Sequence, residues 1–115
     1  MTDEPIDPAA YEELKATIGP EFAIELANTF LEEAPGMLAE LRSARADGDN
    51  VRFRRAAHSL KSNANTFGAM NLAAKAREFE LKGLDADPGR DAIALEALET
   101  EHARAAAALG NLRNG

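Results

Sequence analysis

Residues 50–68 read NVRFRRAAHSLKSNANTFG, and their apolar side chains recur with the period of an α-helix. Projected at about 100° per residue, the stretch has one apolar and one polar side. The apolar side is expected to be buried and consists of Phe53, Ala57, Leu60, Ala64 and Phe67, with Ala56 and Asn63 at its margins. The polar side consists of Val51, Arg54, Arg55, His58, Lys61, Ser62 and Asn65. The stretch therefore predicts an amphipathic helix that presents one histidine to solvent.

The position of His58 suggests chemistry rather than packing. A histidine kept for packing would share the side of Phe53 and Leu60, whereas on an exposed face one imidazole nitrogen can act as a nucleophile. Lys61 lies three residues further on, close enough to screen negative charge that arrives at the ring. The short side chains that follow leave room for a bulky anion such as a phosphoryl group and for a partner surface. The alternative is an ordinary solvated surface histidine.

Helical patterns also precede this stretch. Asp7-Pro8 predicts the start of a short helix that ends near Gly19 and lies across one end of a bundle. Residues 20–47 then carry an apolar stripe in phase through Pro35, so one bent helix is preferred over two separate ones. The expected core residues of this helix are Phe22, Leu26, Phe30, Ala34, Met37, Leu41 and Ala44, and the stripe is widened by Ile24, Ala27, Leu31 and Leu38.

The remaining sequence adds two further helices. Residues 47–50 form so short a turn that the helices on either side must be antiparallel neighbours, and Gly68 is expected to be a structural turn residue. A helix over 69–82 is expected to bury Met70, Leu72, Ala73, Ala76, Phe79 and Leu81. A last helix from about Asp91 to Leu112 is expected to bury Ile93, Leu95, Leu98, Ala105 and Leu109. The sequence thus predicts an all-α fold, an antiparallel up-down-up-down four-helix bundle with a short additional N-terminal helix.

Composition excludes several classes of function. The 115 residues carry a formal net charge of −7, which argues against nucleic acid as a partner. Without cysteine there is neither a disulfide nor a thiolate metal site. The opening MTDEPIDPAA lacks the apolar run of a secretory signal, and no apolar stretch reaches membrane-spanning length. We expect a single cytoplasmic, monomeric domain over residues 1–115, with frayed tails at 1–6 and 113–115.

The segment Ala57-His58-Ser59-Leu60-Lys61-Ser62, followed by Phe67-Gly68-Ala69, resembles the histidine-containing phosphotransfer (HPt) domain. That family is marked by a histidine, leucine at +2, lysine at +3, small residues after it, and an apolar residue and glycine at +9 and +10. The family often has glycine at +4, where this chain has Ser62, which slightly restricts the closest approach to the ring. The motif covers about a dozen residues, and the helix pattern extends the resemblance over most of the chain.

The resemblance implies a stand-alone phosphorelay intermediate rather than an enzyme. HPt domains accept a phosphoryl group from the aspartate of a receiver domain, in a response regulator or a hybrid histidine kinase, and pass it to another receiver. The receiver supplies the Mg²⁺ and most of the catalytic groups, so no cofactor is expected in this chain. The alternative is a helical adaptor that binds a receiver or histidine kinase through the same face and carries no phosphate.

The resemblance also gives residues of the polar side their expected roles. His58 would be the phosphorylated residue, and Lys61 would stabilise the charge of the phosphoryl group. Ser62 and Asn65 would lie beside that group, where they would either hydrogen-bond the phosphoryl oxygens or keep the surface open. Docking to the partner is expected of Val51, Arg54 and Arg55, because the two arginines form a basic cluster in an acidic protein and would complement the acidic active-site region of a receiver. The alternative is that they are ordinary solvated arginines.

The second histidine invites a metal hypothesis, because Glu99 and His102 have the Glu-x-x-His spacing of di-iron bundles. Such sites need a second pair of this kind, and the residue three positions before His58 is Arg55. No metal site is therefore expected. His102 is predicted to be a solvated helix residue.

Overall fold

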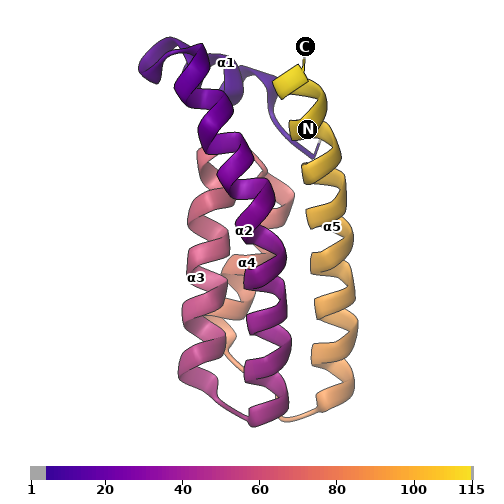
Figure 1. The fold of residues 1–115 in the computed structure, drawn as a ribbon. Helices are drawn as coiled ribbons and strands as arrows, with labels where there is room; N and C mark the ends of the chain where they lie inside the picture. The colour runs from indigo at the N-terminus through magenta and orange to yellow at the C-terminus, as the bar shows by residue number, and fades with distance from the viewer. Residues whose placement is uncertain (1–4, 115) are drawn as a thin grey trace.

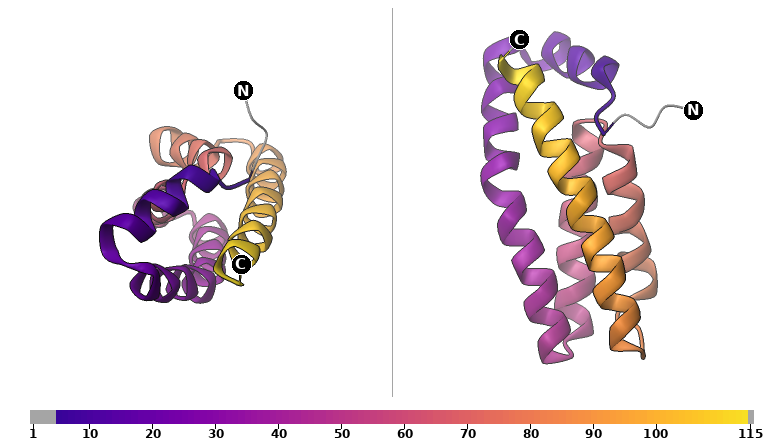
Figure 2. Two further views of the ribbon diagram at one scale, coloured as in Figure 1. Left: turned by 90° about the horizontal axis from the view of Figure 1, so that it is seen from above. Right: turned by 90° about the vertical axis from the view of Figure 1, so that its right-hand side faces the viewer.

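The computed structural model describes residues 5–114, which form five α-helices and, within that range, no strand. The helices are α1 (Pro8–Ile18), α2 (Pro20–Asp47), α3 (Asn50–Thr66), α4 (Met70–Lys82) and α5 (Pro88–Asn114). Helices α2, α3, α4 and α5 alternate in direction along the bundle, so each is antiparallel to the one before it in the chain (Figure 1), and α1 crosses the end at which α2 begins (Figure 2). This confirms the predicted four-helix bundle with a short additional N-terminal helix.

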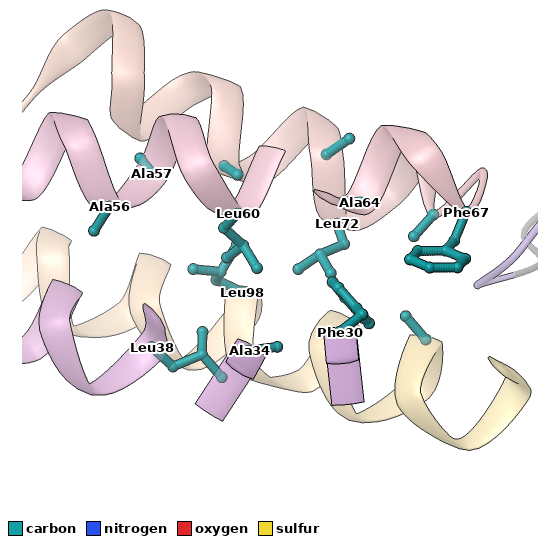
Figure 3. Packing of buried hydrophobic residues seen from close by; sticks show 14 of the residues in the cluster. Phe30, Ala34, Leu38, Ala56, Ala57, Leu60, Ala64, Phe67, Leu72 and Leu98 are labelled. Carbon is teal, nitrogen blue, oxygen red and sulfur yellow. The ribbon is translucent and has the colours of Figure 1, made fainter. Parts of the chain in front are cut away.

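The core lies along the axis of the bundle and receives side chains from α2, α3, α4 and α5. Phe30, Leu60, Leu72 and Leu98, one from each of these helices, point into the same interior (Figure 3). Two aromatic pairs extend this packing. The rings of Phe30 and Phe67 are 5.4 Å apart between centroids, and those of Phe53 and Phe79 are 5.1 Å apart. The apolar side predicted for residues 50–68 is buried throughout.

Helix α2 is one continuous helix of 28 residues through Pro35, as preferred from the sequence. Its buried stripe is, however, rotated from the predicted one at the N-terminal end. Phe22 is 52% exposed, and the buried positions there are Ala23 and Ala27. Adjacent residues differ by about 100° on a helix, so burying the alanine series turns the phenylalanine outward. The small alanine side chains also let the neighbouring helices approach closely.

In α4 and α5, some apolar side chains predicted to be buried lie on the surface. Met70 and Leu81 are exposed at the two ends of α4, and Ile93 is 71% exposed near the start of α5. Each lies on the opposite side of its helix from the buried residues, such as Leu72 in α4 and Leu95 in α5. The other residues predicted to be buried in these two helices are buried.

The start of α5 lies at Pro88, before the predicted start near Asp91. Asp91 is a buried carboxylate within the first turn of the helix. It forms an ion pair with Arg45 of α2, with 2.8 Å between Nε and Oδ2, and accepts a hydrogen bond from the backbone N–H of Asp85. Asp91 therefore ties the α4–α5 loop and the start of α5 to the end of α2.

Helix α1 begins as predicted, with the Asp7 side chain accepting a hydrogen bond from Ala9 N at 3.0 Å and with Pro8 in the first turn. The tail expected at residues 1–6 is wrong at Ile6, which is only 2% exposed, while residues 1–4 lie outside the described range. Asp7 N donates to the carbonyl of Gly68 at 3.0 Å. The segment before α1 is thus held on the turn between α3 and α4.

The tail expected at residues 113–115 is also shorter than predicted. Arg113 lies within α5, and its Nη1 donates to Asn28 Oδ1 of α2 at 2.6 Å. This bond holds the end of α5 against α2. Residue 115 lies outside the described residues.

His102 is not the solvated residue that the sequence predicted. Its ring lies beside that of Phe30, with 6.3 Å between the centroids, and its Nε2 is buried without a hydrogen-bond partner among the described residues. Burial lowers the pKa of His102, and the nearby Glu99 carboxylate opposes this effect. The histidine therefore belongs to the packing between α2 and α5, where burial favours its neutral form.

Among residues 5–114, no helix combines the length and the apolar character needed to cross a membrane.

Gly68 is predicted to be indispensable for the junction of α1 with the α3–α4 turn. Its φ is 70°, and a Cβ there would lie 2.6 Å from the Cβ of Ala10. Gly48 has a similar φ of 66° but open space around it, which makes it a matched control. We expect Gly48→Ala to lower the free energy of unfolding by about 1 kcal/mol and Gly68→Ala by about 3 kcal/mol, because only the second adds overpacking to backbone strain. Urea denaturation measures both, and equal losses would contradict the predicted clash.

His102 is predicted to make the protein less stable in mild acid. Its pKa in the folded state lies below the ordinary value of 6.5, so the unfolded chain binds the proton more tightly. The stabilising effect is complete above pH about 6.5 and is lost as the pH falls from there through the lower folded-state pKa. Free energies of unfolding measured between pH 8 and pH 5 should fall less steeply for His102→Gln than for the parent protein. Identical slopes would show that His102 does not titrate on unfolding.

Candidate functional site

His58 lies in the middle of α3, away from the ends at which a helix frays. The helix is fixed at its start by the side chain of Asp49, which accepts a hydrogen bond from Arg52 N at 3.0 Å. The core side of α3 is buried, and His58 lies away from it with a side chain that is 60% exposed. Its Nδ1 is 3.1 Å from Oε2 of Glu80 on α4. One nitrogen of the ring is therefore occupied by a carboxylate.

Glu80 also contacts Lys61, whose Nζ lies 2.8 Å from Oε2 and 3.1 Å from Oε1. The hydrogen bond from Lys61, followed by that from His58, lowers the pKa of Glu80, so this residue is ionised at neutral pH. An ionised carboxylate can only accept hydrogen bonds. The proton of a neutral His58 must then lie on Nδ1, which leaves the lone pair on Nε2.

Glu80 was not predicted from the sequence. It is 22 positions from His58 and lies on another helix, so its approach depends on how α4 is rotated against α3. The periodicity of α4 places Leu72, Ala76 and Phe79 in the core but does not separate Glu80 from the neighbouring Glu78. Only the packed structure shows which of these carboxylates reaches the histidine.

Ser62 and Asn65 lie where the sequence predicted, on the exposed side of α3 beyond His58. Within residues 5–114, neither side chain makes a hydrogen bond with another residue. Asn65 and Lys61 line one wall of a groove of about 350 Å³ between α3 and α4. The phosphoryl-contacting role expected of Ser62 and Asn65 stays a prediction.

The three residues predicted to dock a partner lie in different surroundings. Val51 is exposed near the start of α3. Arg55 faces α2 and lines a groove of about 550 Å³, together with Met37 and Ala56. Arg54 faces α4 instead, where its guanidinium donates to the carbonyl oxygens of Glu80 and Leu81. The structure therefore brings Arg54 into contact with the backbone that carries the carboxylate.

Two grooves thus flank His58, one between α2 and α3 and one between α3 and α4. The side of α3 that carries His58 also carries Arg54, Arg55 and Lys61, although the chain as a whole has a charge of −7. Within the described part of the chain, no three His, Cys, Asp or Glu side chains gather as a metal site would require. The arrangement offers a positioned imidazole nucleophile with an exposed nitrogen, a lysine beside it, and room for a partner.

A family model described as Hpt domain matches residues 25–111 of this chain, a range that includes His58, Lys61 and Glu80. Among solved structures, the chain is similar to the crystal structure of histidine-containing phosphotransfer protein B (HptB) from Pseudomonas aeruginosa PAO1. The TM-score is 0.84 and the identity 23%, over 98% of this chain and 97% of that chain. None of the curated proteins compared with the chain matches it significantly. The structural similarity concerns the fold.

The contact between Glu80 and His58 predicts one dominant tautomer of the ring. In the neutral state, we expect ¹⁵N NMR to find the proton of His58 mainly on Nδ1. Glu80→Ala removes the acceptor, so the proton should be shared between the two nitrogens and the Nδ1–H form should become a minor species. Glu78→Ala, which removes a carboxylate from the same helix, should leave the tautomers unchanged. A parent protein with the proton mainly on Nε2 would contradict the geometry.

Proposed function

Because the chain belongs to the Hpt domain family, which consists of phosphocarriers of two-component signalling rather than enzymes, we propose that His58 is the residue that carries the phosphoryl group. The observation that carries this proposal is the position of the ring. It is exposed in the middle of α3, with Nδ1 occupied by Glu80 at 3.1 Å and Nε2 left for an incoming group. The only other histidine in the sequence, His102, lies in the packing between α2 and α5 with its Nε2 buried.

The transfer follows from these positions. The lone pair of His58 Nε2 attacks the phosphorus of an aspartyl phosphate on a receiver domain. The Nε2–P bond forms as the P–O bond to the aspartate breaks, and that carboxylate leaves with the bonding electrons. The ring gains positive charge in this step, and the Glu80 carboxylate at Nδ1–H stabilises it. The reverse sequence returns the phosphoryl group to the same or another receiver.

Lys61 is proposed to stabilise the phosphoryl group once it is attached. Its ammonium lies against Glu80 one turn from His58, so a change of rotamer would bring it towards the phosphoryl oxygens. No metal or other cofactor is needed in this chain under the proposal. The Mg²⁺ that neutralises the phosphoryl group during transfer would belong to the receiver.

The partner is proposed to be a receiver domain, free in a response regulator or joined to a hybrid histidine kinase. The acidic active-site region of a receiver would meet the cations beside His58, of which Arg55 is exposed at the groove between α2 and α3. The groove has an apolar floor that includes Met37 and Ala56, which suits an apolar side chain of the receiver surface. Val51 extends this surface along α3.

His58→Gln is predicted to abolish phosphoryl acceptance while the helical fold remains. The parent protein, incubated with a phosphorylated receiver and Mg²⁺, should gain an acid-labile, base-stable phosphate that can be chased into a second receiver. The matched control is His102→Gln, which changes the other histidine and should still be labelled. Undiminished labelling of His58→Gln would refute the site. Binding of a receiver without any labelling of the parent protein would favour the adaptor function instead.

A further inference from the structure

The last turn of α4 is fixed from outside the helix. The final carbonyls of any α-helix lack partners within it, and its end opens easily unless something else binds them. In α4, the carbonyl of Phe79 accepts a hydrogen bond from Gly83 N at 2.8 Å. The next two carbonyls, those of Glu80 and Leu81, accept from Nε and Nη2 of Arg54 at 3.0 Å and 2.8 Å. One guanidinium thus binds two successive carbonyls.

A second residue of α3 holds the backbone that follows. Oδ1 of Asn50 accepts a hydrogen bond from Leu84 N at 2.9 Å. The two segments are close here, because a Cβ on Gly83 would lie 2.3 Å from the same oxygen. Asn50 and Arg54 are one helical turn apart, so they bind the end of α4 from one side of α3.

His58 and Lys61 continue the same line along α3 towards the carboxylate. They contact the side chain of Glu80, while Arg54, one turn earlier, contacts the main-chain carbonyl of that residue. Both the backbone and the side chain of Glu80 are therefore held by residues of α3. Helices α3 and α4 are neighbours in the bundle, as the views of Figures 1 and 2 together show.

We propose that Arg54 is a positioning residue for phosphoryl transfer, which holds the last turn of α4 so that the Glu80 carboxylate meets Nδ1 of His58. The inference rests on the proposed function of His58 and adds to it a residue that touches neither the ring nor the phosphoryl group. Glu80 lies two residues before the end of α4, in the turn that frays first. Without Arg54, the carboxylate would sample positions away from Nδ1 and the ring would lose its fixed tautomer.

The chemistry of arginine suits this task better than that of lysine. A guanidinium offers several N–H donors in a fixed planar fork and can bind two acceptors at once, whereas an ammonium on a flexible chain acts as a point charge. Arg54→Lys therefore keeps the charge of the docking face but loses the paired hydrogen bonds. Arg54→Ala loses both.

The experiment compares these two variants with Arg42→Ala. Arg42 also bridges two helices, because its guanidinium binds both carboxylate oxygens of Glu99 on α5, yet it does not contact Glu80. The first readout is the tautomer of His58 by ¹⁵N NMR. The second is the rate of phosphorylation by phosphoramidate, a small donor that loses ammonia as the Nε2–P bond forms and that needs no docking surface.

We expect Arg54→Ala to shift the ring towards the tautomer mixture of Glu80→Ala and to slow labelling by phosphoramidate about tenfold, since small displacements of reacting groups cost rate steeply. Arg54→Lys should shift in the same direction to a smaller extent. Arg42→Ala should match the parent protein in both readouts, even where its stability is lower. Circular dichroism would establish that each variant is folded.

Two outcomes would overturn the proposal. If Arg54→Ala keeps the parent tautomer and phosphoramidate rate but accepts phosphate slowly from a receiver, Arg54 acts in docking. If Arg42→Ala shifts the tautomer as much as Arg54→Ala, the effect reflects general loosening of the bundle. Failure of the parent protein to accept phosphate from any donor would refute the proposed function, while the tautomer comparison would still decide whether Arg54 positions Glu80.

Discussion

The contact of the Glu80 carboxylate with His58 and Lys61 is the interaction on which the geometry of this surface depends. An exposed imidazole on a helix has two similar nitrogens and free rotation about its side-chain bonds. The carboxylate at 3.1 Å from Nδ1 removes this symmetry, because it accepts a hydrogen bond from the N–H of one nitrogen and leaves the other nitrogen with its lone pair. Lys61 keeps that carboxylate ionised and in place. Two neighbouring side chains are therefore enough to define the orientation of the His58 ring.

This arrangement requires that α3 and α4 keep a fixed register, and several parts of the fold maintain it. Phe53 and Phe79 pack in the core between the two helices, with ring centroids 5.1 Å apart. The turn that joins them is covered by the segment before α1, where Asp7 N binds the carbonyl of Gly68. Arg54 and Asn50 bind the opposite end of α4. The short N-terminal helix thus contributes to the site from a distance, through the turn on which it rests.

The sequence predicted the fold and the exposed position of His58 because both depend on local periodicity. Seventeen residues of α3 show one apolar side, and a histidine opposite that side can only face outward. The rotation of a helix with two possible apolar sides cannot be predicted in this way, as Phe22 and Ala23 show. Both are apolar, and the choice between them depends on how closely the neighbouring helices pack. The prediction for His102 was wrong for a similar reason. The rotation of α5 against α2 places part of its ring beside Phe30, and the sequence of α5 alone does not fix that rotation.

Glu80 and Arg54 were beyond sequence reasoning for a further physical reason. The sequence predicted no role for Glu80 and predicted docking for Arg54. Their actual contacts join groups on different helices, so the periodicity of one helix could not indicate them. A hydrogen bond to a main-chain carbonyl leaves no pattern in the sequence, since residues of every type carry that carbonyl. Residues such as Leu81 enter the site through their backbone alone. The helical wheel gave the correct face for Arg54 but could not tell whether that face met solvent or α4.

Under the proposed function, the Glu80 carboxylate, which contacts both His58 and Lys61, also affects how charge is balanced during transfer. Before transfer, the Glu80 carboxylate balances the Lys61 ammonium. A phosphoryl group brings roughly two negative charges at neutral pH, and it attracts the ammonium of Lys61 away from Glu80. The carboxylate is then left beside a ring that has become more positive, so each anion keeps a cation as its neighbour in both states. Under the proposed function, the same two side chains can therefore support both the free and the phosphorylated histidine.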